Sequence, residues 1–541
     1  MTAGAAAPAA APTPAGSSRP RPLVVLFLCM MAISVFGLFR EFYATSNGIY
    51  GGRDVDADEA TDEDENAPLS GGEYLHYPED VFQTDWSKKV PLPDRLDLGR
   101  IHKTCMRFKD SVIPWNVGSG RITVENVLIN ETDPNLLDRL RQCADVDIFV
   151  PRGLRNNGYC EDAAAYMKCT FEARHQRGRS VQRIDELCHL RARMLPEWIS
   201  TLRITDVKTG KSIGYHDLCP KTPMIFFNHY WEEIPDEETW PQDKKMVLMP
   251  NLEMHELQAE HYWRPDIILC KTAVCVRYLK GWFRLHGNSR GTKVIYTRHT
   301  STDVSSIVRA SLPSSEIAPK NFKDVDFIHT AGTSVQKGTA TIFDCWLRRP
   351  DLPPVDVYMA EKLYIEWFKE KYEKRLKKSK NVRLHLGKMD EVSFGHLIAE
   401  ASFFLCTSIQ EGYGHYINQA RASGGLIITP NVPPMNELVT PSSGVLMNAK
   451  GIGNEYQFLG GNGQHPLALR NVTGFIAHFG HKDVCSAVDD VIQKLTPEER
   501  QRRAERAKQQ YFFDTVFFAR AMEKLKQELG IAHSNVRGVH N

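Results

Sequence analysis

From about residue 145 the chain alternates short apolar runs, rich in β-branched and aromatic residues, with stretches of helical character. Runs that are apolar on both faces and separated by helices are typical of parallel strands covered on both sides of a sheet. We expect nine such strands, at residues 147–150, 224–227, 246–249, 266–269, 293–296, 327–329, 382–386, 403–406 and 426–428. Because this body is too long for one open sheet, the pattern predicts an α/β protein with two doubly wound domains, hinged near residues 297–325.

One uncharged apolar segment, residues 23–39, precedes this body. Its 17 residues are at the short end of what can span a bilayer as a helix. Arg19 and Arg21 precede it and acidic sequence follows, which predicts a cytoplasmic tail over residues 1–22 and a lumenal body. A cleaved signal peptide and a buried soluble helix are the alternatives; the long leader disfavours cleavage. We expect a single-pass type II signal anchor, and its short span favours the Golgi or endoplasmic reticulum membrane.

Residues 40–100 are predicted to form a lumenal stem. Eight of the twelve residues over 54–65 are acidic, and such a self-repelling segment cannot bury enough apolar surface to fold. A ligand-binding acidic tail is the alternative interpretation. Over the whole chain, 67 lysines and arginines stand against 66 acidic residues, so no bulk positive charge favours nucleic acid as a partner.

Twelve cysteines agree with a lumenal location. Cys29 lies in the predicted span, and five others fall within 77 residues of the first half, where we expect one or two disulfides whose partners the sequence does not assign. Cys345 and Cys406 lie in apolar runs and are expected to be buried thiols. Sequons at Asn130 and Asn471 predict N-glycosylation.

One motif stands out, directly after the predicted strand 403–406. The chain there reads Thr407-Ser408-Ile409-Gln410-Glu411-Gly412-Tyr413-Gly414-His415 and continues into a predicted helix over 416–423. A glycine-rich turn between a strand and a helix offers free backbone N–H groups to an anionic or polyhydroxyl ligand. Its glycines let the ligand approach the main chain, and Glu411 adds a carboxylate at the strand's carboxyl edge. Taken alone, the motif fits a structural turn equally well.

Residues 326–446 as a whole resemble the C-terminal, donor-binding domain of the retaining GT-B glycosyltransferases of family four, the "group one" class. Four blocks carry the resemblance in the family's order and spacing: 327–338, 381–387, 401–424 and 429–438. The resemblance implies two Rossmann-like domains facing each other across a cleft. We expect an acceptor-side domain over 101–300, a nucleotide-sugar-binding domain over 301–495 and C-terminal helices over 496–541, the first of them starting at the cap Thr496-Pro497.

The resemblance also implies roles for single residues. Lys337 would hold the diphosphate of a nucleotide-sugar and neutralise charge as the leaving group departs, and Glu411 would orient the donor sugar through its hydroxyls. The donor-binding residues expected beside them are Arg298, Thr333, Gly412, Tyr413, Gly414, Gln419 and Glu437. No metal and no other cofactor is expected, because lysine, arginine and helix dipoles supply the electrostatics in these enzymes; the nucleoside-diphosphate sugar is a co-substrate.

Two positions depart from the family pattern. Gln419 stands where the family has a second glutamate, although glutamine can still hydrogen-bond a ribose hydroxyl. The family's arginine after the first strand is replaced by Thr333-Ser334, and Arg298 near the hinge is expected to reach the phosphates instead, a surface arginine being the alternative. These departures keep open a lumenal sugar- or nucleotide-binding protein that has lost catalysis.

Acceptor-side candidates follow predicted strands of the first domain at their carboxyl edges. His229 and Glu232 follow the strand 224–227, and Glu253 follows 246–249, positions suited to acid–base work or to ordinary hydrogen bonding at the rim. Two Asp-x-Asp sequences, 145–147 and 324–326, spell the metal-binding pattern of GT-A glycosyltransferases. Both precede their predicted strands and are interpreted as strand-entry loops, which leaves a metal-dependent GT-A-like transferase as an alternative.

Together these patterns predict a type II membrane glycosyltransferase of the hexosyltransferase type (EC 2.4). It would transfer a sugar from a nucleoside-diphosphate sugar, with retention, to a glycan, glycoprotein or glycolipid acceptor. Its other expected contact is the membrane, through one helix. The donor sugar, the acceptor and the linkage depend on pocket details of the first domain that the sequence leaves open.

Overall fold

The computed structural model describes residues 77, 79–117, 123–168, 190–205, 210–231, 233–254, 256–453, 457–459, 465–470, 472 and 475–531. All of them belong to one compact unit, Asp64–Asn541. The predicted cytoplasmic tail, the signal anchor at 23–39 and most of the acidic stem lie outside the described residues. Among those described, no helix has both the length and the apolarity to cross a bilayer.

An N-terminal parallel sheet of six strands has the order β2-β1-β5-β6-β7-β8. Its strands are β1 (Val146–Phe149), β2 (Ala192–Leu195), β5 (Met224–Phe227), β6 (Met246–Met249), β7 (Ile267–Cys270) and β8 (Lys293–Tyr296). All but β8 are buried at every position, as expected for strands covered on both faces.

A second parallel sheet of six strands follows, with the order β11-β10-β9-β12-β13-β14. Its strands are β9 (Phe327–Gly332), β10 (Val355–Met359), β11 (Val382–Leu386), β12 (Phe403–Leu405), β13 (Leu426–Pro430) and β14 (Val445–Met447). Two short antiparallel pairs complete the described strands: β3 (Ile204–Thr205) with β4 (Ser212–Ile213), and β15 (Lys450–Ile452) with β16 (Ile476–His478).

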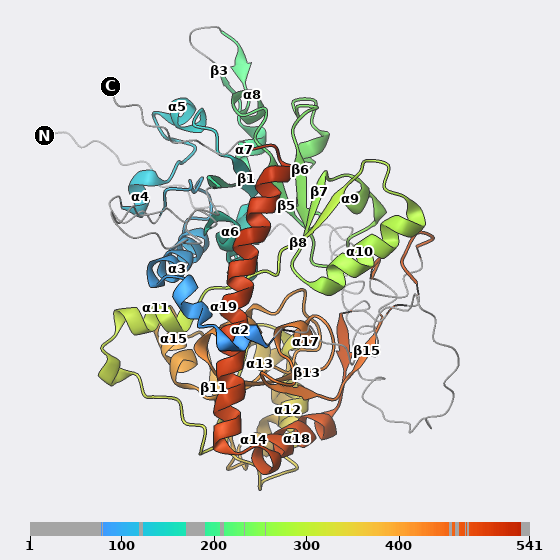
Figure 1. Cartoon of the computed structure of the whole chain (residues 1–541). Helices are drawn as coiled ribbons and strands as arrows, with labels where there is room; N and C mark the ends of the chain where they lie inside the picture. The colour runs from blue at the N-terminus through green and yellow to red at the C-terminus, as the bar shows by residue number, and fades with distance from the viewer. Residues whose placement is uncertain are drawn as a thin grey trace, which may run out of the picture. The chain divides into compact units, whose positions relative to one another are not determined.

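Helices cover both sheets (Figure 1). Those before the second sheet are α2 (Asp80–Gln83), α3 (Leu92–Arg107), α4 (Val124–Val127), α5 (Leu136–Leu140), α6 (Asn157–Lys168), α7 (Trp198–Thr201), α8 (Tyr215–Leu218), α9 (Ala259–Trp263), α10 (Ala273–His286) and α11 (Val304–Ser311). Those that follow are α12 (Thr339–Trp346), α13 (Glu361–Trp367), α14 (Lys369–Leu376), α15 (Glu391–Glu400), α16 (His415–Ser423), α17 (Met435–Leu438), α18 (His481–Asp489) and α19 (Pro497–Glu528).

Each sheet reverses its direction of strand addition once. In the N-terminal sheet the reversal lies between β1 and β5, and in the second sheet between β9 and β12. Loops that leave the carboxyl ends of such neighbouring strands diverge and leave a crevice where ligands bind in doubly wound sheets. The prediction of an α/β protein with two doubly wound, Rossmann-like domains is confirmed, and this topology locates the edge at which each domain presents its loops.

The last helix, α19, ties the two domains together (Figure 1). Its 32 residues begin at Pro497 as predicted, with Thr496 capping the amide of Glu499. Ala504 packs into the hydrophobic core of the second domain, whereas Met522 and Leu525 pack into that of the first. The helix is therefore part of both cores.

The predicted stem is shorter than residues 40–100. Tyr77 is buried and donates a hydrogen bond to Asp514, and α3 packs along α6. These residues belong to the folded body because they carry apolar side chains to bury, which the acidic stretch 54–65 lacks. The predicted hinge segment is likewise largely buried at 297–303, where Thr302 donates to Glu161.

Three strands of the two parallel sheets were missed from sequence. β2, β10 and β14 carry charged residues, alternate in burial or are very short, so none reads as a fully apolar run. Two helices, α13 and α14, follow after Met359 ends β10.

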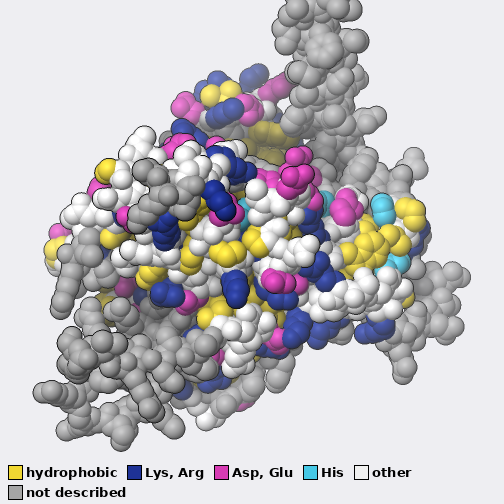
Figure 2. Space-filling model, turned by 90° about the horizontal axis from the view of Figure 1, so that it is seen from above, with side chains coloured by type: hydrophobic (Ala, Val, Ile, Leu, Met, Phe, Trp, Pro, Cys, Tyr) yellow, Lys and Arg dark blue, Asp and Glu magenta, His cyan; other side chains and the backbone are white. Residues whose placement is uncertain are grey.

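The described cysteines form four disulfides: Cys105–Cys160, Cys143–Cys219, Cys270–Cys275 and Cys345–Cys485. The expectation of disulfides in the first half is confirmed. The buried thiol at Cys406 is also confirmed, whereas that at Cys345 is wrong, because the fold brings α12 and α18 together. On the face shown in Figure 2, acidic and basic side chains are intermixed, as the nearly equal totals of the two lead one to expect.

Candidate active site

Lys337 and Glu411 meet at the point where the second sheet reverses. Lys337 ends the short turn after β9, Glu411 follows β12, and the two side chains form an ion pair that is mostly buried. Ser408 donates a hydrogen bond of 2.5 Å to Glu411, and the Lys337 ammonium lies 3.9 Å from the centre of the Tyr416 ring. The fold thus brings together the two residues to which the resemblance assigns the main roles.

The turn around Lys337 requires the glycine that follows it. Gly338 has φ +70°, and a Cβ there would collide with the carbonyl oxygen of Thr407. The Thr407 hydroxyl in turn donates to the Lys337 carbonyl, at 3.0 Å. The sequence Lys337-Gly338 therefore permits the close approach of the loops after β9 and β12.

The glycine-rich turn before α16 faces the N-terminal domain. A Cβ at Gly412 would overlap the carboxylate of Glu253, and Gly414 has φ +105° at the helix N-cap. The Tyr413 side chain is buried, and its hydroxyl donates to the carbonyl of His299. The turn consequently touches loops from the carboxyl edges of β6 and β8.

The carboxyl group of Glu253, which lies at this contact, is an unusually weak acid. Burial raises its pKa to about 7; Lys271 opposes the rise, and the negative charges of Glu411 and Asp162 add to it. Its Oε2 atom is buried without a hydrogen-bond partner among the described residues. A carboxyl near half-protonation at neutral pH can either accept or donate a proton.

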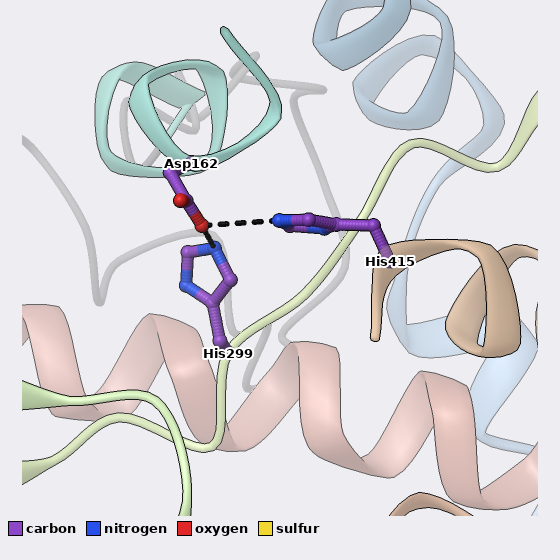
Figure 3. Close-up of side chains that lie close together, drawn as sticks. All are labelled: Asp162, His299 and His415. Atoms are coloured by element: carbon purple, nitrogen blue, oxygen red, sulfur yellow. Dashed lines mark hydrogen bonds and ion pairs between the residues drawn. The ribbon is translucent and has the colours of Figure 1, made fainter. Parts of the chain in front are cut away.

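A charged cluster that the sequence analysis missed lies beside Glu253. Asp162 of α6 accepts two hydrogen bonds of 3.1 Å from Lys271, and its Oδ1 lies 2.8 Å from His299 Nε2 and 3.1 Å from His415 Nε2 (Figure 3). Burial alone would raise the pKa of Asp162, but Lys271 and both histidines hold it well below its usual range. Burial lowers the pKa of His299 to about 4, so its imidazole is neutral at physiological pH.

The ligand atoms of Asp162, His299 and His415 lie within 4.8 Å of one another, a spacing that could hold a metal ion. The lysine ammonium on both carboxylate oxygens already neutralises Asp162, which fits an ion-pair network at least as well. The absence of a metal stays a prediction. Lys271 and His299 follow β7 and β8 at their carboxyl edges, so the same rule that selected Glu253 could have found them.

Two predicted donor-binding residues instead join the two domains. Gln419 of α16 donates a 2.9 Å hydrogen bond to Glu161 of α6. Glu437 accepts from the backbone amides of Ala273 and Val274, at 2.6 and 2.8 Å, at the N-terminus of α10. A carboxylate is favoured there by the unpaired N–H groups and the helix dipole.

Arg298 and Thr333, two further predicted donor-binding residues, have different surroundings. Arg298 adopts φ +53°, its Nε lies 3.3 Å from Asp514 of α19, and its guanidinium covers the ring of Tyr77 at 4.5 Å. It lines the same small pocket as Lys271 and Glu437. Thr333 is exposed just beyond β9. Reaching a phosphate from Arg298 would mean competing with Asp514 for its charge.

The remaining predicted residues are placed as follows. His229 follows β5, and its ring is tilted against that of Tyr230, with ring centres 4.2 Å apart, whereas Glu232 lies outside the described residues. Asn130 is exposed and accepts a hydrogen bond from Ser111, and Asn471 lies outside the described residues.

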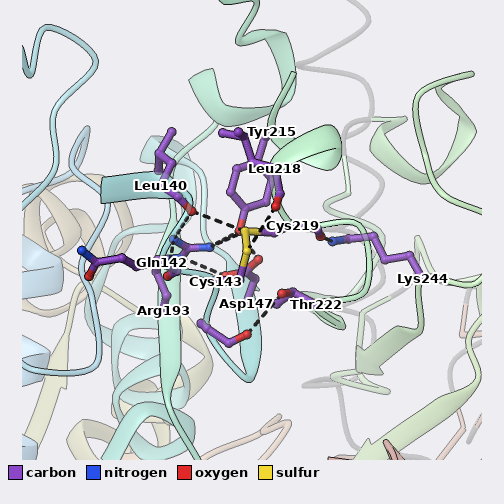
Figure 4. The surroundings of a disulfide bond; sticks show 11 residues. Leu140, Gln142, Cys143, Asp147, Arg193, Tyr215, Leu218, Cys219, Thr222 and Lys244 are labelled. Carbon is purple, nitrogen blue, oxygen red and sulfur yellow. Dashed lines mark hydrogen bonds and ion pairs between the residues drawn. A yellow bond between two sulfur atoms is a disulfide. The ribbon is translucent and has the colours of Figure 1, made fainter. Parts of the chain in front are cut away.

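Three of the four Asp-x-Asp aspartates are paired with arginines. Asp147 lies inside β1 rather than before it, and forms a buried ion pair of 3.0 Å with Arg193 beside the Cys143–Cys219 disulfide (Figure 4). Asp145 contacts Arg191 at 2.8 Å, and Asp326 contacts Arg383 at 2.7 Å. The strand-entry interpretation is therefore wrong for Asp147, whose burial needs the arginine partner that β2 supplies.

No family model matches the chain. No curated protein matches it either. Several solved structures match in part. The GtfA/B complex matches with 15% sequence identity and a TM-score of 0.40. The match covers 59% of this chain and 62% of the chain in that structure. Sucrose-phosphate synthase from Thermosynechococcus elongatus has 12% identity and a TM-score of 0.44, and a trehalose-6-phosphate protein from E. coli bound with UDP-2-fluoro glucose has 9% and 0.45. Both cover 72% of this chain and are themselves covered to 99%. Matches this remote assign the chain to no family.

Proposed function

We propose that the protein is a glycosyltransferase that uses a nucleoside-diphosphate sugar as donor. The observation that carries the proposal is the Lys337–Glu411 pair at the reversal point of the second sheet, opposite Glu253 of the first domain. One cation for a diphosphate and one carboxylate for sugar hydroxyls, at the edge where doubly wound sheets bind ligands, are the groups such a reaction needs.

In the proposed reaction the bond between the anomeric carbon and the diphosphate oxygen breaks, and an acceptor hydroxyl forms the new bond. Negative charge grows on the leaving diphosphate, where the Lys337 ammonium stabilises it. Glu411 accepts hydrogen bonds from the donor sugar. The acceptor hydroxyl loses a proton, and Glu253, with its carboxyl near half-protonation, is the group we assign to receive it.

We assign Asp162 and Lys271 a positioning role. Asp162 is bonded to Lys271 and lies within 3.1 Å of His415, the first residue of α16, while Gln410, just before Glu411, donates to the Glu253 carbonyl at 3.0 Å. These contacts hold the glycine-rich turn against the first domain. Because effective catalysis depends on sub-ångström placement, their loss would lower turnover without removing a reacting group.

Retention of anomeric configuration, a glycan, glycoprotein or glycolipid acceptor, and a Golgi or endoplasmic reticulum location as a type II membrane protein are also proposed. They rest on the family resemblance and on the sequence around residues 23–39. Protease protection on intact microsomes tests the topology. Digestion of residues beyond 45 without detergent would overturn the lumenal assignment.

A metal-dependent GT-A-like transferase is the second candidate, although three of the four Asp-x-Asp aspartates that suggested it are paired with arginines. Activity that persists in EDTA is expected, and complete loss restored by manganese would favour this candidate. A non-catalytic sugar- or nucleotide-binding protein is the third, and it predicts donor binding without release of nucleoside diphosphate.

The proposal is tested by thermal unfolding of the full chain against a panel of nucleoside-diphosphate sugars. A donor that binds the folded state raises the melting temperature by an amount that grows with the ratio of its concentration to its dissociation constant. We expect at least one such donor, and we expect Lys337→Ala to abolish its effect. Lys362→Ala is the matched control, because Lys362 also pairs with a glutamate, at 3.7 Å, but is 84% exposed on α13. No stabilisation by any panel member would contradict the proposal.

A further inference from the structure

A second basic site lies away from the Lys337–Glu411 pair. A partly open cavity of about 360 Å³ is lined by α3, α11, the end of α16 and α19. Four cations line it, namely Arg95, Arg309, Lys320 and Lys508, against one acidic residue, Glu505. The proposed reaction uses none of these side chains, and their charges are contributed by four separate parts of the chain.

The neutralising partners of these cations are few. Arg95 lies 3.6 Å from Asp303 and donates to Ser306 at 3.1 Å, so its charge is largely balanced. Arg309 donates only to a backbone carbonyl, that of Ala399, at 2.8 Å, as far as the described residues show. The Lys508 ammonium makes no hydrogen bond or ion pair among them.

The closeness of these cations to one another affects Lys320. Its ammonium donates to the carbonyls of Ile398 and Ala401 and to the Ser423 hydroxyl, none of which carries a charge. Burial lowers the pKa of Lys320 to about 7, and the nearby positive charges of Arg309 and Lys508 lower it further than Glu400 raises it. A negative group in the cavity would relieve this repulsion.

We propose that this cavity binds a small phosphorylated or sulfated anion, at a site separate from the one proposed for the donor. Its volume suits a small molecule, and clustered guanidinium and ammonium groups are the usual partners of phosphate oxygens. Ser305 and Ser306 add hydroxyls to the same wall. A membrane headgroup shares this chemistry, and binding to lipid vesicles is the measurement that separates the two sources.

The location links the site to the proposed donor turn. Ala422, Ser423 and Gly424 form the cavity wall at the C-terminal end of α16, and the same helix begins at His415. Nine residues at 1.5 Å each separate the two ends by about 14 Å. A ligand in the cavity would therefore contact the C-terminal end of the helix that begins directly after the glycine-rich turn.

The test uses inorganic pyrophosphate and isothermal titration calorimetry on the full chain. All titrations are made in the Lys337→Ala background, which removes the proposed diphosphate contact and makes failure here distinct from failure of the proposed function. We expect saturable binding that weakens at least tenfold when Arg309→Gln and Lys508→Gln are added. The matched control pair is Arg141→Gln with Lys494→Gln, two exposed cations elsewhere, and it should leave the affinity unchanged.

Two results would overturn the proposal. One is unchanged pyrophosphate affinity in the Arg309→Gln/Lys508→Gln variant. The other is no saturable pyrophosphate binding at all in protein that circular dichroism shows to be folded. If that protein instead cosediments with phosphatidylserine–phosphatidylcholine vesicles, and the two substitutions abolish this, the cations form a membrane-binding surface.

Discussion

At the residue scale, Glu253, which lies at the contact between the domains, makes the stability of the fold depend on pH. Its pKa rises from 4.5 in an unfolded chain to about 7 in the fold, so folding favours the protonated carboxyl. The corresponding stabilisation is fully present below pH 4.5 and is lost as the pH rises through 7.

Glu253→Gln mimics the neutral form at every pH. The variant and the wild type should therefore have similar free energies of unfolding at pH 4, and the variant should be more stable at pH 8 by on the order of 3 kcal/mol. Urea unfolding of both proteins across this range measures the difference. A difference that stays constant with pH would show that the carboxyl does not titrate as its surroundings indicate.

Glu411 provides the second prediction at this scale. Glu411→Gln keeps the shape of the side chain and can still accept from Ser408, but it loses the charge that pairs with Lys337. We expect turnover to fall roughly a hundredfold and selectivity among donor sugars to weaken in a protein that still folds, with a lower melting temperature because the mostly buried Lys337 ammonium loses its partner. Steady-state kinetics measure this, with Glu391→Gln as a control at an exposed glutamate that also pairs with a lysine. Normal turnover and selectivity would remove Glu411 from the mechanism.

At the scale of elements, α19 contributes one buried carboxylate, Asp514, that contacts three other segments of the chain. Asp514 accepts from Arg421 of α16 at 2.7 Å and from Tyr77 at 2.8 Å, and lies 3.3 Å from Arg298 after β8. Removing one partner of a buried ion pair leaves an uncompensated charge.

Asp514→Asn should therefore lower the free energy of unfolding by roughly 3–5 kcal/mol. The control is Asp490→Asn, which breaks an exposed pair with Lys494 and should cost about 0.5 kcal/mol or less. Chemical denaturation of the wild type and both variants measures these losses in the free energy of unfolding. Equal, small losses would mean that α19 is not anchored through this carboxylate.

The same scale shows what sequence reasoning could recover. Strands with uninterrupted apolar runs, such as β5 and β6, were predicted within a residue of their observed bounds. β2 escaped because Arg193 interrupts it, and this charge is buried only because Asp147 of the neighbouring strand accepts from it. β10 alternates in burial, with Asp356 paired to Arg383, so it lacks the pattern of a strand apolar on both faces.

At the scale of the whole molecule, the order of strands explains why half of the candidate site was visible in the sequence. Lys337 and Glu411 lie within recognisable local motifs, and the sheet brings them together as the resemblance implies. Asp162, Lys271 and His299 belong to three segments with no motif of their own. Lys271 and His299 lie at the strand ends that could have been selected from the sequence, but Asp162 lies on a helix, and only the folded first domain shows that the three converge.

The most direct measurement compares the turnover of Lys337→Ala with that of the wild type, as nucleoside diphosphate released from a donor that binds. The Lys337 ammonium is proposed to stabilise charge that appears on the leaving group only as the bond breaks. Its removal should lower kcat by roughly a hundredfold, about 3 kcal/mol, with a smaller effect on KM. Lys362→Ala should leave both constants unchanged. Wild-type turnover by a stably folded Lys337→Ala protein would contradict the proposal that sugar transfer takes place at the Lys337–Glu411 pair.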